Sequence, residues 1–497
     1  MGQYKQSHLQ YVQWLRNKEK ELQLIEQIIQ HVENPKLIEL KPLEEKLGVP
    51  AETLQKLIEK IYGPKTQIKQ KLYHWWQEPD GAIRKIDAHY LHKRIKNAMK
   101  ELGAENPYQL AKKLNVPEGK VNIIRDWMRQ SPIVSAKTRV LKRIFNLLGI
   151  PLEELEERKA ILDRNFPIDL YSPKIVKLYT HALNEGSLAI PKSPTQTSLR
   201  YVNQDPVLIR KFIDTVKEAG GWAKILPPQK PGFDVYTDSV TARIINAAGL
   251  PYGRKTITDP PLHPAILKNP KLTKHHLHIT FLEEGYTTFS YAKDRLQLII
   301  GLVRSKDITD HIPPEILREL LNYKGQKVQP AKFFTEYFIE ERLLAVAPTA
   351  LLQERRLIEK LIEERFSIST RPKILISHLH ISMDGKITAI YRYAVRSEEA
   401  IQLFKEIVLA EPLGTWKEYR FQKMLEIYEK YKGRKLTPRE KQEIKQQTPP
   451  SQIPENWIII KARQLLAKEA PWVNDEQKIK IITQWYKKDD RNEKSKF

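Results

Sequence analysis

Two apolar segments, roughly a hundred residues apart, constrain the fold of this chain most strongly. Leu178–Gly186 and Leu277–Gly285 each have the pattern of an apolar helix that ends in a glutamate followed by glycine. Glycine lets a chain turn away at a helix end, so the preceding carboxylate can extend out of a packed core toward a metal ion or a phosphate. If the two helix ends lie side by side, Glu185 and Glu284 form a paired acidic site.

The composition indicates a folded chain with a polyanionic partner. With 497 residues, 41% of them hydrophobic, the chain is long and apolar enough for two to four domains with real cores. Its formal net charge of +24 exceeds what solubility requires and favours nucleic acid as the partner, ahead of a membrane surface. No apolar run approaches the roughly 18 residues that span a bilayer, so we expect no membrane partner.

The lack of cysteine narrows the chemistry further. It excludes disulfides, thiolate zinc sites and cysteine nucleophiles, and it predicts a cytoplasmic, nucleoid-associated protein. Abundant Lys, Glu and Ile with no Cys and few Met is typical of heat-adapted, thermophilic proteins.

The first third of the chain has the pattern of helices in two units, 1–80 and 81–165. In the first unit, Leu43–Leu47, a turn at Gly48 and a second helix to Ile61 form one helix-turn-helix candidate, whose alternative is a plain helical pair. In the second unit the same scheme returns over Tyr108–Trp127, where Asn115 suits the turn and Pro117 can start the next helix.

The second unit resembles the phage-repressor class of helix-turn-helix domains over Ala88–Lys159, which carries a helix before the turn motif and another after it. The resemblance implies that Glu118–Arg129 is the recognition helix, with Lys120, Asn122 and Arg125 reaching base edges or phosphates. The alternative is a three-helix packing module without a nucleic-acid contact.

Residues 166–412 change from all-helical to mixed patterning. A helix, a strand pair, a helix, a second strand pair and a helix follow each other over 166–260, and the order repeats over 261–412 with a helical insertion at about 330–366. Asp384-Gly385 between alternating apolar runs predicts a hairpin. Residues 413–497 form a basic region with a helical pattern. We therefore expect an α+β fold with a duplicated αββαββα core, all-α N-terminal domains and a helical C-terminal tail.

The duplicated segment resembles the LAGLIDADG homing endonucleases, specifically the archaeal single-chain type with two pseudo-symmetric halves. The two helices that end in Glu-Gly carry the resemblance, and three flanking stretches support it: Pro167–Pro173, Tyr201–Ile209 and Ala248–Thr256. The resemblance covers roughly half of the chain. It implies a monomer that acts as a pseudo-dimer on double-stranded DNA.

The resemblance also implies a set of functional residues. Glu185 and Glu284 would be catalytic metal ligands for Mg²⁺ or another divalent cation, which activates water and neutralises charge on the phosphate. Lys255 matches the place of an active-site lysine and would stabilise the anionic transition state. The strands would form a saddle on the duplex, and five basic residues are expected to contact phosphates and bases. These are Arg200, Lys224, Arg304, Arg392 and Arg396.

Two departures from the family pattern bear on activity. The family's motif helices touch through small residues at the third and seventh motif positions, where this chain has Thr180 and Asn184 in the first helix and Ile279 and Glu283 in the second. Ile and Glu do not suit a close helix crossing. Both final acids are Glu rather than the more usual Asp. Either departure is compatible with a scaffold that has lost cleavage.

Histidines at 275, 276, 278, 378 and 380 suggest a metal site at first sight. Residues two apart on a helix point in different directions, and the strand pair has no third ligand nearby in sequence. We interpret them as packing or DNA-facing residues.

Three functions fit the sequence. The first is a site-specific, Mg²⁺-dependent double-strand DNA endonuclease of the LAGLIDADG type, with helix-turn-helix domains that add DNA affinity. The second is a DNA-binding regulator that uses the same scaffold without cleaving, and the third is an RNA-binding protein that assists splicing. In a further, non-catalytic alternative, Glu185 and Glu284 are solvated helix-end acids without a metal.

Overall fold

The chain folds into a mixed arrangement of helices and sheets. The computed structural model describes residues 40–50, 71–113, 122–129, 132–191, 195–312, 314–330, 346–368 and 374–483, with single positions at 24, 27, 53, 54, 193 and 343. The amphipathic pattern over Gln6–Ile38 also predicts a helix, and this segment lies outside the described residues except for positions 24 and 27. Of the first helix-turn-helix candidate, helix α2 (Leu40–Leu47) and Gly48 are described, and most of the second helix is not.

Residues 71–165 form a helical unit that also contains strands. Its elements are β1 (Leu72–Tyr73), η2 (Trp75–Gln77), β2 (Ile83–Asp87), α4 (Ala88–Glu101), α5 (Pro107–Lys113), α6 (Asn122–Arg129), β3 (Ile133–Lys137), α7 (Thr138–Leu147) and α8 (Glu154–Glu157). Strands β2 and β3 pair antiparallel, and β1 pairs with β4 (Ile168–Asp169). The expectation of an all-α domain was therefore wrong. Alternate residues of β2 and β3, among them Ile86 and Val134, are buried, which is the burial period of a strand.

The next unit contains the first glutamate-ending helix. Its elements are α9 (Pro173–Asn184), β5 (Gly186–Leu188), β6 (Leu199–Asn203), α10 (Pro206–Glu218), β7 (Ala223–Leu226), β8 (Phe233–Thr237), α11 (Ser239–Ala247), α12 (Lys255–Thr258) and α13 (Pro264–Lys268). The sheet order is β5-β6-β8-β7. Asp205 and Asp238 accept hydrogen bonds from the first turns of α10 and α11, which explains where these helices begin.

The following unit contains the second such helix. Its elements are α14 (Pro270–Glu284), β9 (Gly285–Ala292), β10 (Arg295–Asp307), η4 (Thr309–His311), α15 (Pro314–Leu320), η5 (Leu321–Tyr323), β11 (Lys327–Val328), α18 (Thr349–Phe366), β12 (Ile374–Ile381), β13 (Ile387–Val395) and α19 (Glu398–Leu409). The sheet order is β11-β12-β13-β10-β9. When the short edge strand β11 is left out and the second sheet is read from β9, its order is β9-β10-β13-β12. Both sheets then place the strands of their unit in the order first, second, fourth, third.

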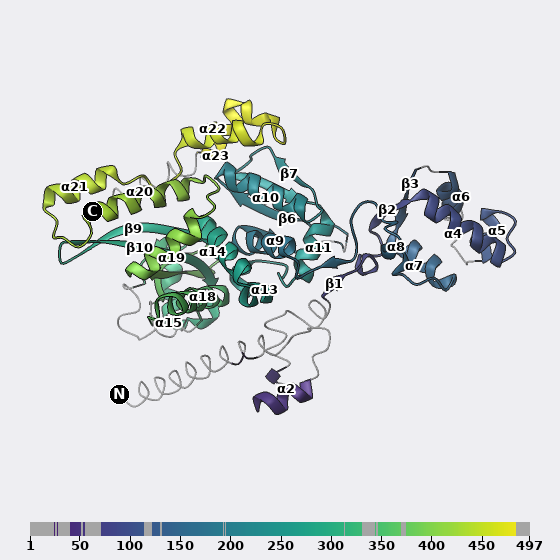
Figure 1. Cartoon of the computed structure of the whole chain (residues 1–497), viewed down its shortest axis with the longest axis horizontal. Helices are drawn as coiled ribbons and strands as arrows, with labels where there is room; N and C mark the ends of the chain where they lie inside the picture. The colour runs from purple at the N-terminus through teal and green to yellow at the C-terminus, as the bar shows by residue number, and fades with distance from the viewer. Residues whose placement is uncertain are drawn as a thin grey trace.

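The C-terminal helices belong to both cores. They are α20 (Trp416–Tyr431), α21 (Pro438–Gln447), α22 (Glu455–Leu466), η6 (Pro471–Asn474) and α23 (Glu476–Thr483). Helix α20 packs against β9 and β10, and α22 packs against α10 (Figure 1). Phe421 joins the core of the second sheet, while Ile458 and Leu466 join the core of the first. In the described part of the chain, no helix has both the length and the apolar character needed to cross a membrane.

Glycine is required after Glu185 and Glu284 because a Cβ atom would not fit there, and not because the chain adopts a left-handed turn. Gly285 has φ −81° and ψ 159°, an extended conformation that any residue adopts. A Cβ at Gly285 would lie 2.7 Å from Cδ2 of Phe281, and one at Gly186 would lie 2.6 Å from Cα of Ala182. The expected sharp glycine turn is therefore corrected to a close approach of the first strand residue to the preceding helix turn.

We predict that Gly285→Ala destabilises the fold by about 3 kcal/mol, because the added methyl group overlaps Phe281 in a packed region. Gly433→Ala is the matched control. Gly433 has φ +80° and nothing within 4 Å of its Cβ position. Gly433→Ala should therefore lower the free energy of unfolding by only about 1 kcal/mol, because an alanine is strained in the left-handed conformation. Urea denaturation of both variants measures the two losses. Equal losses would contradict a steric requirement at Gly285.

Candidate active site

Helices α9 and α14 pack against each other through polar side chains. Thr180 Oγ1 and His276 Nδ1 lie 3.1 Å apart, and Asn184 Nδ2 donates to Thr280 Oγ1 over 3.3 Å. All four residues are buried. Buried polar groups that are paired in this way fix one arrangement of the two helices, since any shift would leave them without partners.

Glu283 lies in the middle of this crossing and has three partners. The Nδ1–H of His181 donates to Oε1 over 2.6 Å, the hydroxyl of Tyr201 donates to the same oxygen over 2.5 Å, and Asn184 Nδ2 donates to Oε2 over 2.7 Å. These contacts explain how a glutamate is accommodated at a buried helix crossing. Ile279, the other departure, is completely buried.

This packing brings Glu185 and Glu284 to adjacent helix ends. Glu185 directly follows α9, and Glu284 is the last residue of α14. Both side chains are partly exposed, and neither carboxylate forms a hydrogen bond or ion pair with any residue in the described ranges. Burial raises the pKa of Glu185 to about 8, and the charges of Glu284 and Glu283 act in the same direction. Burial also raises the pKa of Glu284, against the opposing effect of Arg304 and Lys255.

Two lysines cap the two helix ends. Nζ of Lys255, at the start of α12, donates to the carbonyl of Leu183 over 2.8 Å and also to that of Asn184. Nζ of Lys417, in the first turn of α20, donates to the carbonyl of Glu283 over 2.7 Å. A cation at a helix C-terminus satisfies unpaired carbonyls and complements the helix dipole.

The same lysines have altered acidity. Burial lowers the pKa of Lys255 to about 8, although Glu284 and Glu185 oppose the shift. Burial likewise lowers the pKa of Lys417 against the same two glutamates. Two acids with raised pKa values beside two lysines with lowered ones form the type of cluster that is characteristic of catalytic sites.

A cavity of about 100 Å³ opens beside this cluster. Glu284, Lys255 and Arg304 line it, together with Asp259 and Thr256. The sequence-predicted residues Glu185, Glu284, Lys255 and Arg304 are therefore brought together around one site, although Glu185 is not among the cavity's lining residues.

Arg304 is placed differently from the expectation of a surface contact to DNA. Its side chain is 8% exposed. Nε and Nη2 donate to the two carboxylate oxygens of Glu354 over 3.0 and 2.5 Å, and Nη2 also donates to Oδ1 of Asn184 over 2.6 Å. Arg304 is thus a buried residue of the site, because it lies on the inward-facing side of β10 with Leu302.

Arg200 and Lys224 share one face of the first sheet. The strand register places Ser187, Arg200, Tyr236 and Lys224 in one row across the sheet. Lys224 is exposed, whereas Arg200 forms a bidentate ion pair with Asp234 over 2.8 and 2.7 Å.

Arg392 and Arg396 belong to the second sheet. Arg392 is half-buried on β13, with its guanidinium 5.3 Å from the ring centroid of Tyr286. Arg396 is exposed just after the same strand. In the N-terminal unit, Asn122 and Arg125 are exposed on α6, and Lys120 lies outside the described residues.

Two histidines of α14, His276 and His278, pair with carboxylates. Nε2 of His276 lies 3.1 Å from Glu354 Oε1, and Nε2 of His278 lies 2.9 Å from Glu418 Oε1. These pairs hold α14 against α18 and α20. No group of three His, Cys, Asp or Glu side chains arranged to hold a metal ion occurs within the described ranges.

Sequence reasoning missed Lys417 and Glu354. A signal for Lys417 existed, since Lys255 begins the helix after α11 and Lys417 lies in the first turn of the helix after α19, and α11 and α19 each follow the last strand of their unit's sheet. No local signal indicated Glu354, which lies in the first third of α18 and contacts residues far away in sequence.

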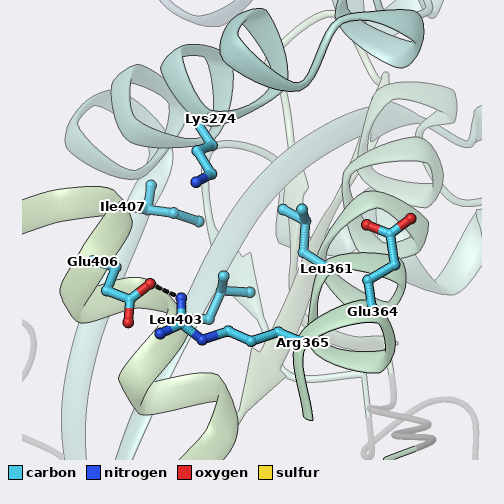
Figure 2. A pocket seen from close by; sticks show the side chains of 7 residues that line it. All are labelled: Lys274, Leu361, Glu364, Arg365, Leu403, Glu406 and Ile407. Atoms are coloured by element: carbon cyan, nitrogen blue, oxygen red, sulfur yellow. Dashed lines mark hydrogen bonds and ion pairs between the residues drawn. The ribbon is translucent and has the colours of Figure 1, made fainter. Parts of the chain in front are cut away.

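A larger cavity of about 220 Å³ lies between α14, α18 and α19, away from the acids. Figure 2 shows Lys274 pointing into it and the Arg365–Glu406 ion pair crossing it. Leu361, Leu403 and Ile407 also line this cavity.

No family model and no curated protein matches the chain. The solved structures that are similar at a low level include two LAGLIDADG nucleases. One is the LAGLIDADG homing endonuclease I-GzeII in complex with its DNA target, at 10% identity and TM-score 0.29, covering 56% of this chain and 97% of that chain. The other is the LAGLIDADG meganuclease I-AabMI bound to uncleaved DNA, at 13% identity and TM-score 0.28, covering 56% and 98%. Similarity at this level carries no argument about function.

The raised pKa of Glu185 predicts a pH-dependent loss of stability. Between its ordinary value of 4.5 and about 8, the folded protein retains a proton that the unfolded chain releases, so the free energy of unfolding falls as pH rises through this window. Glu185→Gln should remove this fall and be more stable than the unsubstituted protein by on the order of 2 kcal/mol at pH 8, with little difference at pH 4.5. Denaturation of both proteins in EDTA at several pH values measures this difference in the free energy of unfolding. A constant difference across the range would contradict the shift.

Proposed function

We propose that the protein is a site-specific double-strand DNA endonuclease of the LAGLIDADG type, built on a duplicated αββαββα core. The observation that carries the proposal is the pair of glutamates at adjacent helix ends, without ion pairs to described residues and each beside a lysine. The corresponding strand orders of the two sheets support the duplication. The motifs and flanking stretches of the sequence support the family.

The residues of the site fit a divalent cation. Mg²⁺ is typically bound through one or two carboxylates, with water and substrate phosphate oxygens completing its shell. Glu185 and Glu284 supply two carboxylates whose mutual repulsion a cation would relieve. A bound cation would activate water and neutralise negative charge on the phosphate.

The lysines would act on the phosphate directly. Lys255 and Lys417 are held by backbone carbonyls, so their ammonium groups are fixed before DNA arrives. Preorganised cations of this kind stabilise negative charge that develops in a transition state. Because the pKa of Lys255 is about 8, this support should weaken above that pH as the lysine loses its proton.

The basic character of the chain would supply the DNA-binding surface. With a formal net charge of +24, affinity for a phosphate backbone is expected to be strong and salt-dependent. The exposed faces of the two sheets, with Lys224, Arg392 and Arg396, would follow the duplex, and α6 would add a second contact.

The test is cleavage of a supercoiled plasmid that carries the two sequences flanking the encoding gene, joined into one uninterrupted site. With Mg²⁺ we expect linear product with discrete ends. Glu185→Gln and Glu284→Gln should each slow cleavage roughly a hundredfold or more while binding of the site in EDTA persists. Glu218→Gln, an exposed glutamate at the end of α10, is the control and should cleave normally.

Two results would contradict the proposal. Shifted gel mobility without cuts in Mg²⁺ or Mn²⁺ would indicate the non-cleaving regulator. Cleavage that survives both glutamine substitutions would place the chemistry elsewhere.

The N-terminal unit should contribute affinity without setting the position of the cut. We predict that Arg125→Gln weakens binding and lowers the slope of log K against log salt by about one unit, because one phosphate contact is lost. Arg139→Gln on α7 is the control, since Arg139 is also exposed but lies outside α6. Fluorescence anisotropy at several salt concentrations measures the slope. An unchanged slope for Arg125→Gln would support a packing role for this unit.

A further inference from the structure

Helix α18, which lies in the segment inserted into the second unit, contacts residues that line the candidate site. At its start, Oδ1 of Asp259 accepts from the backbone N–H of Thr349 over 2.8 Å, and Asp259 directly follows the helix that carries Lys255. Five residues after Thr349 on α18, Glu354 is completely buried and pairs with both Arg304 and His276. The insertion is thus connected to two residues that line the 100 Å³ cavity, Asp259 and Arg304.

The pairing fixes the position of the Arg304 guanidinium. Glu354 accepts from Nε and Nη2, and Asn184 accepts from Nη2, while no hydrogen bond to a described residue engages Nη1. The Glu354 carboxylate raises the pKa of Arg304 despite burial, so the residue stays charged. Burial acts to raise the pKa of Glu354, but Arg304 and His276 together outweigh it and hold this pKa below its ordinary value. A charged guanidinium therefore faces the cavity beside Glu284.

The corresponding position of the first unit carries no arginine. Gly186 pairs with Tyr201 on β6, and Gly285 pairs with Leu302 on β10. Two residues further along each strand lie Asn203 and Arg304. Asn203 accepts from the backbone N–H of Asp205 and carries no charge. The two glutamates consequently lie in unequal surroundings, with a third cation on the side of Glu284.

The geometry points to Arg304 as a phosphate-binding residue for one of the two DNA strands, held in place by Glu354 as a positioning residue. This inference rests on the proposed endonuclease function. Arg304 Nη1 would donate to an oxygen of the scissile phosphate that enters the cavity beside Glu284. The other strand would be cleaved without such an arginine, so the two strands depend on different residues.

Nicking of a supercoiled plasmid tests this inference, because single-strand and double-strand cuts give nicked and linear products. In Arg304→Gln, cleavage of one strand should slow on the order of a hundredfold while the other continues, so nicked plasmid accumulates. Glu354→Gln should give the same strand bias through a misplaced Arg304, and Arg304→Lys should restore part of the lost rate. Sequencing the nicked product identifies the affected strand, which should be the same in all variants.

Two controls separate a role in cleavage from a role in folding. Arg304→Gln combined with Glu354→Gln removes both charges and avoids an unpaired buried ion, so it should fold and still accumulate nicked plasmid. Glu359→Gln, which affects the Arg355–Glu359 pair on the same helix, should cleave both strands normally.

A readout without metal tests the phosphate contact itself. In EDTA, Arg304→Gln should lower the slope of log K against log salt by about one unit for the cognate duplex, and Glu359→Gln should not. Linear product without nicked intermediate in the Arg304 variants, or an unchanged salt slope, would overturn the assignment while leaving the endonuclease intact. If the unsubstituted protein cuts neither strand in Mg²⁺ or Mn²⁺, the endonuclease and the Arg304 assignment both fail.

Discussion

The contact between α9 and α14 determines the position of every group in the candidate site. Asn184 is central to it, because its amide nitrogen donates to Glu283 and its amide oxygen accepts from Arg304. A buried amide that uses both ends in this way tolerates little sliding of one helix along the other, since sliding would leave a buried acceptor or donor unsatisfied at about 1–3 kcal/mol each. The positions of Glu185 and Glu284 follow directly, as each lies at the end of one of these helices.

Directional hydrogen bonds, and not close packing of small residues, hold α9 and α14 together where they cross. Small residues let two helices approach through dispersion contacts that need no exact partner. Here Glu283 is fully buried and depends on His181, Tyr201 and Asn184 together. Removing one partner from a buried carboxylate costs more than losing a surface ion pair, because desolvation is no longer offset. The crossing therefore gains specificity of alignment, and its stability depends on all of its partners being present.

Much of the element order could be predicted from the sequence, because strands and helices are local patterns. Local patterning predicts a strand over Phe233–Thr237 and a helix over Glu398–Val408. The strand has these bounds, and the helix extends by a single residue. Glu185, Glu284 and Lys255 were found because each lies in a short motif. Strands β2 and β3 were missed, since they are short, flank three helices and pair across about fifty residues. The partners of Glu283 and Arg304 could not be predicted either, because these contacts join segments between 50 and 120 residues apart.

Lys417 shows why the C-terminal helices cannot be treated as an appendage. Its ammonium group reaches the carbonyl of Glu283 only because α20 begins beside the end of α14, where Asp205 accepts from the backbone N–H of Trp416 over 2.9 Å. Asp205 also caps α10, so one carboxylate of the first unit orders a helix of the first unit and a helix of the C-terminal region. Its pKa is raised by burial to about 6, against the backbone donors that stabilise its charged form. The lysine beside Glu284 is therefore positioned by the first unit, just as Arg304 is bound to Asn184 at the end of α9. Each helix end thus depends on a residue from outside its own unit, and the site is complete only when both units and the C-terminal helices are assembled.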